Sequence, residues 1–547
     1  MNKLFYGDNL TIMQNMKKHC VDLIYLDPPF SSKKNYNILY KTMTGMPVPE
    51  QVEAFCDTWE LDAEKEQRAR EMPILLREHG VDENYVDFWR IWVNALRNTQ
   101  PHLLAYLIYM VERLIHMKVI LKKTGSIYLH CDPTASHYIK IMMDGIFGHN
   151  NFQNEVIWKR TSAHSSAKKW GPVHDVILFY TMSNKYKWNK VHQPYDTEYI
   201  DTFYKYKDED GRRYTVGDLT GAGIRHGESG GEWRGHNPTK KGRHWAIPRQ
   251  VPEIDVLPKS IMKALDKLDE AGRIFWPSRG GVPRFKRYLD DMSGVQIQDI
   301  IYDIPPISSH GKERLGYPTQ KPIALLRRII EASSKKGDVV FDPFCGCGTT
   351  LYAAHESGRK WIGCDIAILS IKLIRHVLEE KYRLAESKHF VIDGIPVSVE
   401  QARILFKHDP FQFQHWFVER IGGFPMQKKV ADRGIDGRLY FELGSKLYEM
   451  ILSVKGGTIR PTDVRDLRGV LEREDNAIMA GFLSMKKPTK AMKSEASEAG
   501  IFEYSDIKYD RIQFLTVEDV LVGKKEFHTP TRIGVKGKTG QVNLPIG

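Results

Sequence analysis

A strand-like run, Val21–Leu26, ends on the tetrapeptide Asp27-Pro28-Pro29-Phe30, and this junction restricts the fold of the chain more than any other feature. An apolar strand that carries an acidic residue at its carboxyl end places the carboxylate at a sheet edge, where open α/β folds bind ligands. Each proline fixes φ and removes a backbone donor, so the acceptors face a ligand without competing N–H groups. Beside the flat Phe30 ring, they suit a planar group with an exocyclic amine, such as an extruded nucleobase. A rigid strand-to-loop turn is the alternative for the tetrapeptide alone.

A second constraint lies far downstream, where a short buried strand at 337–341 runs into Asp342-Pro343-Phe344-Cys345-Gly346-Cys347-Gly348-Thr349-Thr350. Two glycines one residue apart, before the amphipathic stretch Leu351–Ser357, predict a tight strand-to-helix turn that a ligand can approach closely. The next strand, Lys360–Cys364, ends on Asp365, where a carboxylate can hydrogen-bond a ribose. The full G-x-G-x-x-G spacing of a dinucleotide site is absent, and the acid follows sooner than such a site expects.

These motifs resemble those of the amino-group DNA methyltransferases that use S-adenosylmethionine, over most of the first 380 residues. Asp27-Pro28-Pro29-Phe30 is similar to their catalytic motif, and 342–350 to their cofactor loop. Tyr317–Pro322 resembles the motif before that loop, and Leu4–Asn9 the one that opens the chain. The order, with the catalytic motif first and the cofactor loop last, is that of the circularly permuted β group. Cys347 departs from the family, which often has Ser there; both are small, so we expect cofactor binding to be retained.

The resemblance implies a role for each motif. Asp27 would accept one N–H of the target amine and the Pro28 carbonyl the other, while Phe30 would stack on the flipped base. Alignment and desolvation would then lower the barrier to attack on the sulfonium methyl. Asp365 would take the ribose hydroxyls and Asp8 the adenine amine of the cofactor. The residues implied for S-adenosylmethionine are Asp8, Thr319, Lys321, Asp342, Phe344, Gly346, Gly348, Thr349 and Asp365.

The first residue of the catalytic motif indicates the target base. In this family Asp goes mostly with adenine-N6 and Ser with cytosine-N4, so Asp27 favours adenine and leaves cytosine-N4 as the alternative. We therefore expect a site-specific adenine-N6 DNA methyltransferase that is part of, or fused to, a restriction–modification system. A hypothesis of another class is a nuclease or DNA-binding module that carries an inactive methyltransferase. The intact catalytic and cofactor motifs argue against it.

Charge and cysteine content agree with an enzyme that acts on double-stranded DNA in a cytoplasmic compartment. The net charge of +12 favours a polyanionic partner. Six cysteines without a paired framework indicate reduced thiols, and Cys345 and Cys347 are expected to pack their loop rather than hold a metal. No signal peptide is expected, and a homodimer is an open option. The most apolar window, Leu103–Leu121, carries charged residues and predicts a buried helix rather than a membrane span.

The expected fold is α/β, a Rossmann-like methyltransferase core with one inserted domain and one C-terminal domain. The expected divisions are a catalytic half at 1–180 with a helical insertion at about 41–100, a target-recognition domain at 181–309, a cofactor half at 310–388, a restriction-endonuclease-like domain at 396–522 and a basic flexible tail at 523–547. A helix is expected to follow Asp365 to about Glu386, and the segment Phe390–Pro396 to mark a boundary.

The stretch 181–309 is polar and poorly periodic, and basic residues alternate with aromatics around it. The wider window 151–300 holds 25 Lys and Arg against 19 Asp and Glu, a net of +6, and six of the eleven tryptophans. Such a mixture suits phosphate contact, base-edge reading and duplex distortion. An ordinary loop-rich subdomain is the alternative. The candidate DNA contacts are Arg225, Arg234, Arg243, Arg279 and Arg284. Replacing the Arg-rich segment Arg273–Arg287 is expected to lower DNA affinity and to leave cofactor affinity unchanged.

The C-terminal segment carries a pattern of its own. Gly434–Gly437 begins a strand and Leu447–Lys455 forms its partner. Asp436 with Ser453-Val454-Lys455 resembles the Asp and Glu-x-Lys of restriction-endonuclease-like domains, closest to the Mrr-type branch. In such sites two carboxylates hold Mg²⁺ and the Lys positions or activates the attacking water. Ser453 is a poorer ligand than a carboxylate, so Glu419 on the preceding helix is the candidate to complete a Mg²⁺ site with Asp436. A fold kept only to bind DNA or to stabilise the enzyme is the alternative.

Overall fold

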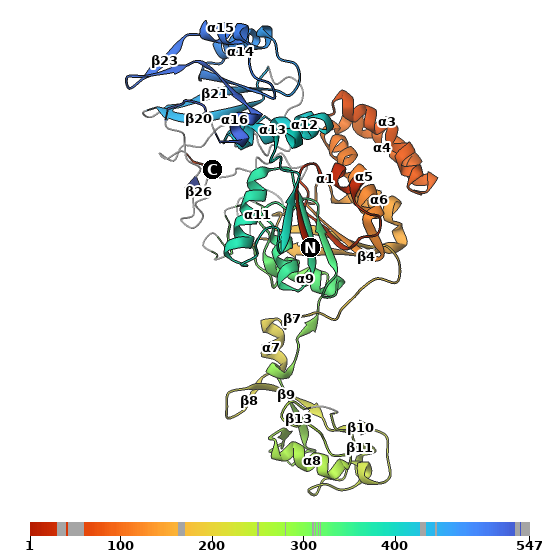
Figure 1. The fold of residues 1–547 in the computed structure, drawn as a ribbon. Helices are drawn as coiled ribbons and strands as arrows, with labels where there is room; N and C mark the ends of the chain where they lie inside the picture. Colours follow the sequence, from red (N-terminus) through yellow and green to blue (C-terminus); the bar gives the residue numbers. More distant parts are fainter. Residues whose placement is uncertain are drawn as a thin grey trace. The chain divides into compact units, whose positions relative to one another are not determined.

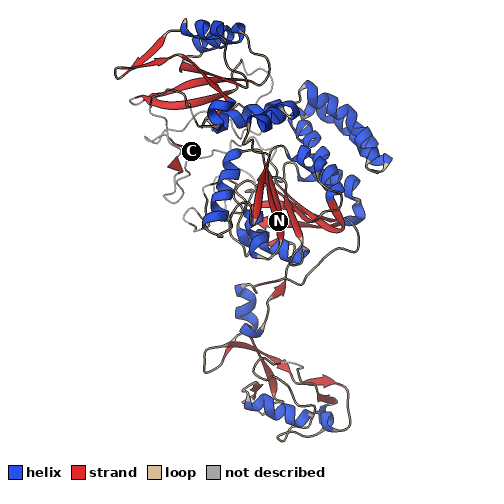
Figure 2. Cartoon of the chain, in the orientation of Figure 1, coloured by secondary structure: helices blue, strands red, loops and turns tan. Residues whose placement is uncertain are grey.

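The computed structural model describes residues 1–29, 40–41, 59–161, 170–248, 251–278, 280–308, 311, 313–315, 317, 319–426, 434–443, 446–523, 525–530 and 536–537. The chain forms two compact units, Met1–Asn189 with Asp299–Gly547, and Lys190–Gln298. Figure 1 labels many of the helices and strands of both units, and Figure 2 colours them by type. The first unit alternates strands and helices, so the predicted α/β class is confirmed.

A nine-stranded sheet in the order β15-β5-β6-β4-β2-β16-β17-β1-β18 is the centre of the first unit. All neighbours pair in parallel, apart from β6, which runs antiparallel to β4 and β5. The strands are β1 (Asn2–Tyr6), β2 (Val21–Leu26), β4 (Leu121–Cys131), β5 (Phe152–Lys159), β6 (His174–Thr181), β15 (Ile300–Ile301), β16 (Val339–Asp342), β17 (Lys360–Asp365) and β18 (Phe390–Asp393). The strands that carry the two principal motifs, β2 and β16, are therefore neighbours.

Helices cover both faces of this sheet, and the side chains of β2 show how. Leu23 and Tyr25 join a core cluster with α9, α10 and α11, whereas Ile24 and Leu26 join a second cluster with α3 to α6. All six residues of β2 are buried, as expected of a parallel strand covered on both sides. The helices are α1 (Asn9–Asn15), α3 (Ala63–Glu78), α4 (Glu83–Thr99), α5 (Pro101–Ile120), α6 (Ser136–Phe147), α9 (Ile323–Ser333), α10 (Thr349–Glu356) and α11 (Ile368–Glu380).

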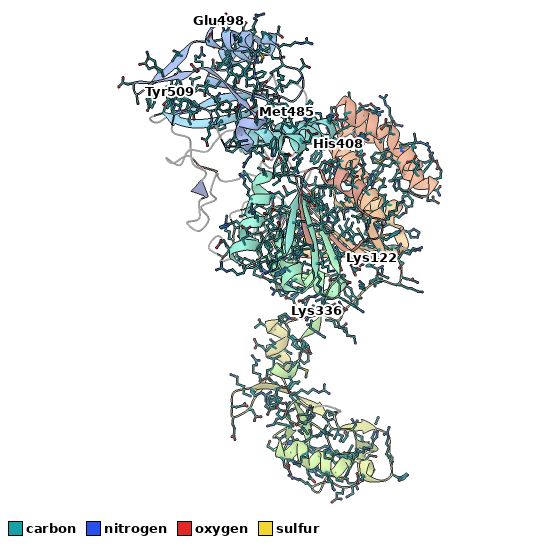
Figure 3. The ribbon with its side chains drawn as sticks, viewed as in Figure 1. Lys122, Lys336, His408, Met485, Glu498 and Tyr509 are labelled. Atoms are coloured by element: carbon teal, nitrogen blue, oxygen red, sulfur yellow. The ribbon has the colours of Figure 1, made fainter. Side chains whose placement is uncertain are left out.

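The buried carboxylate of Asp22 joins β2 to β16 at the end of the sheet opposite Asp27. It accepts hydrogen bonds from Lys122 and Lys187 at 2.8 Å and from the backbone N–H of Val339 at 3.0 Å. Figure 3 labels Lys122 among the side chains. Because a buried carboxylate is costly without partners, these three donors help to fix the register between strands that are distant in the chain.

The predicted helix at Leu103–Leu121 is confirmed as α5, most of which is buried against the sheet and the helical insertion. In the described parts of the chain, no helix combines the length and the apolar content that a membrane crossing requires.

Two predictions after Asp365 need correction. The helix expected to continue to about Glu386 ends at Glu380, and the segment expected to mark a boundary forms β18, an edge strand that pairs with β1. The methyltransferase sheet therefore extends beyond residue 388. Phe390–Asp393 forms the strand, and Gly394 and Pro396 follow it, so the change of chain direction comes after the last strand of the sheet rather than before it.

The C-terminal part of this unit builds a five-stranded sheet in the order β19-β20-β21-β22-β25. Its strands are β19 (Phe424–Pro425), β20 (Gly437–Leu443), β21 (Lys446–Lys455), β22 (Ala477–Ser484) and β25 (Ile512–Thr516), with a hairpin of β23 (Ile501–Tyr504) and β24 (Ile507–Asp510). Its helices are α12 (Val399–His408), α13 (Pro410–Arg420), α14 (Pro461–Arg473), α15 (Lys490–Ser497) and α16 (Val517–Leu521). Most of the predicted tail lies outside the described residues, and a short pair joins β3 (Tyr40–Lys41) to β26 (Lys536–Gly537).

The second unit has a hydrophobic core of its own, in which Trp233, Trp245, Leu265 and Phe285 are buried. A four-stranded sheet in the order β12-β13-β9-β8 lies at its centre. The elements are α7 (Thr197–Phe203), α8 (Ile261–Glu270), β7 (His192–Gln193), β8 (Tyr206–Lys207), β9 (Arg213–Asp218), β10 (Thr220–Ala222), β11 (Arg243–Trp245), β12 (Ile274–Phe275), β13 (Arg284–Tyr288) and β14 (Val295–Gln296). Its strands are short, which explains the poor periodicity of the sequence.

Candidate active site

The carboxyl ends of β2, β16, β17 and β1 meet at one edge of the large sheet, because these four strands are parallel neighbours. An aspartate lies at or just after the end of each strand: Asp27, Asp342, Asp365 and Asp8. Asp27, the glycine turn and Asp365, which are scattered over the sequence, are thus assembled at the kind of edge where α/β folds bind ligands.

Asp27 is the sheet-edge carboxylate predicted to act on the base. Its side chain is 16% exposed, and Lys321 donates a hydrogen bond to Oδ2. Pro28 is buried and Pro29 exposed, and Phe30 lies outside the described residues. Sequence reasoning assigned Lys321 to the edge of the cofactor pocket; in the structure its ammonium group donates to the carboxylate of Asp27 and holds that oxygen in place.

The glycine turn has the geometry that the spacing predicted. Gly346 and Gly348 both have positive φ, +50° and +85°, a region that favours glycine. A Cβ at Gly348 would lie 2.8 Å from Ile374 and 2.9 Å from the Tyr352 hydroxyl, so this position is also closed by packing. Gly348 precedes α10, and Thr349 is buried in its first turn. Cys345 and Cys347 are buried in the core cluster, where they pack the loop as expected.

Asp365 holds the two segments that surround the turn. Its Oδ2 accepts the N–H of Gly346 at 2.8 Å, and its Oδ1 accepts the N–H of Ala367 at 2.9 Å. Burial raises the pKa of Asp365 to about 6, although these backbone donors oppose the shift. The carboxylate therefore connects the glycine turn to the start of α11.

Asp342 is the most deeply buried carboxylate at this edge, with 3% of its surface exposed. Its Oδ1 accepts the N–H of Phe344 at 3.0 Å. Burial raises the pKa of Asp342 to about 7, and the charges of Asp27 and Asp365 raise it further. The buried carboxylates at this edge are close to one another, and their mutual repulsion would be reduced by a ligand that carries positive charge.

A pH dependence of stability follows from Asp342. Because its folded pKa, about 7, exceeds the ordinary 3.8, ionisation costs stability; this cost is absent below about pH 4 and complete above about pH 7. Asp342→Asn removes the titration, so between about pH 5 and pH 8 we expect the variant to gain about 2 kcal/mol over the unmodified protein. Denaturant unfolding of both proteins at the two pH values measures the difference. Exposed Asp393→Asn is the control, and an Asp342→Asn difference that does not change with pH would contradict the burial argument.

Asp8 is held by neighbours that the motif did not reveal. It caps α1 by accepting the N–H of Leu10 at 2.7 Å, and its other oxygen accepts Arg113 Nη2 at 2.7 Å. The buried Arg113 also donates to Asn9 at 2.7 Å, and Asn9 donates to the carbonyl of Pro343 at 2.9 Å. This chain of bonds ties the first motif to the cofactor loop. The sequence signal was present, since an arginine inside an apolar helix needs a buried partner.

The remaining predicted cofactor residues lie around the same loop. Phe344 has its ring centroid 6.3 Å from that of Tyr109. Thr319 is half-buried in the segment that also contains Lys321 and Tyr317. The Tyr317 ring packs closely on the glycine turn. A Cβ atom at Gly346 would lie only 3.2 Å from this ring.

A buried polar array next to Asp27 was missed by the sequence reasoning. The Tyr25 hydroxyl bonds His130 Nδ1 at 2.8 Å, and His130 Nε2 lies 3.1 Å from Asp175 Oδ2. Arg160 forms an ion pair with Asp175 at 3.2 Å. The array crosses β2, β4 and β6. Its signal was the presence of His and Asp within otherwise apolar strands, which requires partners.

In the C-terminal sheet, the structure brings together part of the predicted nuclease set. Asp436 Oδ2 accepts the N–H of Val454 at 2.6 Å, so Asp436 lies beside the end of β21, where Ser453 and Lys455 are located. Ser453 is buried, with 4% of its surface exposed.

Glu419 does not join that set, which corrects the predicted metal pair. Its Oε2 accepts the Tyr6 hydroxyl at 3.2 Å and the N–H of Ile368 at 3.3 Å, both from the methyltransferase half. The predicted Mg²⁺ site at Asp436 and Glu419 therefore lacks its second carboxylate. Among the residues that the structure describes, no group of three or more His, Cys, Asp or Glu side chains is arranged to hold a metal ion. The helix was predicted correctly, but its orientation depends on tertiary packing.

Comparisons with known proteins find one matching family and several relatives. The model of the N6_N4_Mtase family, described as DNA methylase, matches residues 21–375. The type II methyltransferase M.EcaI of Enterobacter cloacae is 36% identical over 271 residues, 49% of this chain and 56% of that protein. The Mod subunit of the type III restriction-modification enzyme StyLTI of Salmonella typhimurium is 26% identical over 389 residues, 67% of this chain and 52% of that protein.

A third relative is similar over a shorter region. The DNA adenine methyltransferase YhdJ of Escherichia coli is 49% identical over 73 residues, 13% of this chain and 25% of that protein. The chain spans about half the length of the first two relatives and a quarter of the third.

Proposed function

The chain belongs to the DNA methylase family that its residues 21–375 match, and on this premise we propose that it transfers a methyl group from S-adenosylmethionine to the N6 amine of adenine in duplex DNA. The observation that carries the proposal is the assembly of Asp27, Asp342 and Asp365 at the carboxyl ends of three neighbouring strands. The names of the relatives, which include a DNA adenine methyltransferase and a restriction-modification subunit, support the choice of base and a place in such a system.

The motif order supports the circularly permuted β group. The strand with the catalytic motif, β2, comes first in the chain, and the strand with the cofactor loop, β16, comes much later, yet the two pair directly. The pairing of β1 with both β17 and β18 then places the opening motif beside the ribose-binding acid. We infer that the permutation changes the order in which the core is synthesised and preserves the positions of its groups.

The buried acids fit the cofactor. S-adenosylmethionine would supply an electrophilic methyl group on a sulfonium, which nitrogen can attack while the C–S electron pair stays with sulfur. Asp342 and Asp365, whose pKa values burial raises, would gain a cation nearby. Asp365 would bind the ribose hydroxyls, and the open backbone at Gly346 would allow the ligand to approach.

The target amine would be held by Asp27. Lys321 occupies Oδ2, so we assign Oδ1 to one amine N–H and the Pro28 carbonyl to the other. These acceptors increase electron density on a nitrogen that is otherwise conjugated with the ring, and the carboxylate is the base placed to receive the proton that the nitrogen loses. Alignment in a site that excludes water supplies the rest of the rate enhancement.

Analysis of nucleosides from treated DNA tests the proposal. Unmethylated duplex DNA is incubated with the protein and S-adenosylmethionine, digested and examined by mass spectrometry. N6-methyladenine is the expected product. If N4-methylcytosine alone appears, the cytosine alternative replaces this assignment; if the cofactor binds normally and no duplex is methylated, the methyltransferase domain is inactive.

We propose that the unit Lys190–Gln298 recognises the DNA target, but with fewer arginines than the sequence indicated. Arg234, Arg243 and Arg284 each pair with an aspartate of the same unit, and Arg279 lies outside the described residues. Arg273, only 1% exposed, is bound to Glu253 and Asp291. Arg273, the first residue of the segment expected to support DNA binding, therefore has its guanidinium group bound by two carboxylates of its own unit.

The exposed Arg225 is the candidate that keeps its charge available. With His226 and Lys240 it lines a hollow of about 440 Å³, also bordered by Ile224 and Thr239. Three basic side chains around one concave surface suit a phosphate or a base edge.

A prediction for DNA affinity follows. Arg225→Ala/Lys240→Ala should weaken duplex binding by about tenfold without changing cofactor affinity. The slope of log binding constant against log salt concentration should decrease by the equivalent of about two phosphate contacts. Fluorescence anisotropy across a salt series measures both. Arg234→Ala, in which the lost charge is already paired, is the matched control. An unchanged salt slope in the double variant would remove this hollow from the DNA interface.

A second candidate function is DNA cleavage by the C-terminal sheet. The bond between Asp436 and the backbone of Val454 favours it, because this bond places the acid next to Lys455 at adjoining strand ends. Incubation with unmethylated DNA and Mg²⁺ or Mn²⁺, beside Asp436→Ala/Lys455→Ala, tests it. Cleavage lost in the double variant supports a fused restriction–modification enzyme. Absence of cleavage with either metal would support a binding or assembly role.

A further inference from the structure

Glu419, near the end of α13, makes its hydrogen bonds outside the C-terminal sheet. One carboxylate oxygen accepts both the Tyr6 hydroxyl and the N–H of Ile368. Tyr6 is the last residue of β1, and Ile368 is the first residue of α11. Both residues therefore flank segments that carry the predicted cofactor acids, Asp8 and Asp365.

The start of α11 needs an acceptor that its own sequence does not provide. The residue in the N-cap position is Ala367, which has no side-chain acceptor, and the first turn contains no acidic residue. Exposed N–H groups at a helix start are normally bound by such side chains. Asp365 accepts one of them, from Ala367, and Glu419 accepts the next, from Ile368. Glu419 thus acts as the cap of α11 from a distant part of the chain.

The position of Glu419 is determined by packing along α13. Trp416, Phe417 and Val418, which precede it, are buried in the same hydrophobic cluster as Ile368 and Ile371 of α11. A helix buried in this way cannot withdraw without exposing large apolar surface, which would cost several kcal/mol per side chain. The packing of α13 consequently keeps the Glu419 carboxyl group in contact with the start of α11.

We propose that α13 of the C-terminal domain completes the cofactor site, with Glu419 as a positioning residue that fixes the start of α11 and, through it, the orientation of Asp365. The proposal rests on the assignment of S-adenosylmethionine to the edge formed by Asp342 and Asp365. The C-terminal domain is then required for normal cofactor affinity, whether or not it cleaves DNA.

The charges around Glu419 indicate which substitution retains its role. Burial raises the pKa of Glu419 to about 8, and the charge of Asp365 raises it further, whereas Lys372 lowers it. Tyr6, Asp409 and Arg420 are the other ionisable groups near these residues. At pH 7 the carboxyl is therefore mostly protonated. Gln keeps a carbonyl oxygen of similar reach, so Glu419→Gln should still accept both hydrogen bonds, whereas Glu419→Ala cannot.

Isothermal titration of the full-length chain with S-adenosylmethionine at pH 7 tests the proposal. We expect Glu419→Ala to raise Kd about tenfold and Tyr6→Phe about threefold, and Glu419→Gln to stay within about twofold. Glu400→Ala, on the neighbouring helix α12 and paired only with Arg403 on the surface, is the matched control. At saturating cofactor the Glu400→Ala control should methylate at the rate of the unmodified protein. In Glu419→Ala the loss should fall mainly on cofactor affinity and much less on that rate, because Glu419 does not touch the base.

Each other outcome overturns a defined part of the argument. Unchanged affinity in a folded Glu419→Ala variant overturns the positioning role, and so does a loss in Glu419→Gln equal to that in Glu419→Ala. If Glu419→Ala does not fold, Tyr6→Phe decides, since it removes one hydroxyl without removing volume; normal affinity then overturns the proposal. If the unmodified protein binds no S-adenosylmethionine at all, the proposed function fails first, and this inference fails with it.

Discussion

Asp27→Ala should lower the methylation rate by about 10³-fold while cofactor affinity stays within about twofold, because the carboxylate acts on the target base. The variant removes the acceptor of an amine N–H and the nearest base for the departing proton. It also removes the carboxylate that accepts the Lys321 hydrogen bond beside the position proposed for the target nitrogen.

The measurement for Asp27 combines single-turnover methylation with titration of S-adenosylmethionine. Asp393→Ala is the matched control, because Asp393 ends β18, a parallel strand of the same sheet, but is exposed at the sheet edge. It should behave like the unmodified protein. An Asp27→Ala variant that retains a tenth of the rate would show that another group holds the amine. A parallel loss of cofactor affinity would show that Asp27 belongs to the cofactor site instead.

Asp365→Ala should weaken S-adenosylmethionine binding by about 10²-fold, and the methylation rate at saturating cofactor should fall much less. Two losses combine in this variant. The ribose hydroxyls lose a charged acceptor, and the N–H groups of Gly346 and Ala367 lose the carboxylate that now holds the glycine turn against the start of α11. Each of these bonds to a buried ionisable group is worth more than a bond between neutral partners.

The Asn variant separates the two contributions at Asp365. Asp365→Asn keeps one oxygen for a backbone donor and removes the charge, so its affinity should lie between those of the Ala variant and the unmodified protein. Titration calorimetry and thermal unfolding on the same samples distinguish ligand loss from unfolding. If both substitutions leave Kd unchanged while abolishing transfer, the roles assigned to Asp27 and Asp365 are reversed.

Local sequence was sufficient for the individual motifs. Asp27, Asp342 and Asp365 each follow a short apolar strand, and a carboxylate in that position lies at the carboxyl end of the strand whatever the rest of the fold does. The positive φ of Gly346 and Gly348 was similarly encoded in the spacing of the turn, because few other residues adopt that conformation. The buried helix α5 was evident from an apolar window with too many charged residues for a membrane.

Partners from distant segments were not encoded in any local pattern. Lys321 was predicted at the edge of the cofactor pocket, but its motif does not say which acid the ammonium group reaches, and its bond to Asp27 appears only in the folded chain. Arg273 begins a basic segment that was expected to support DNA binding, yet Glu253 and Asp291 bind its guanidinium group. Arg113 was noticed only as a charge in an apolar helix, and its bond to Asp8 required the packing of α5 on α1.

The contacts of Glu419 are the clearest example of a feature that the sequence alone did not predict. The sequence alone determined that the chain has an α/β core with its acids at the ends of strands, since strand alternation and turn chemistry act over a few residues. Only the tertiary structure decided that β18 extends the large sheet and that α13 directs Glu419 to Tyr6 and Ile368 instead of Asp436. The physical reason is that the rotation of a helix about its axis depends on which apolar side chains fill which cluster, and Trp416 and Phe417 find their places only in the assembled core.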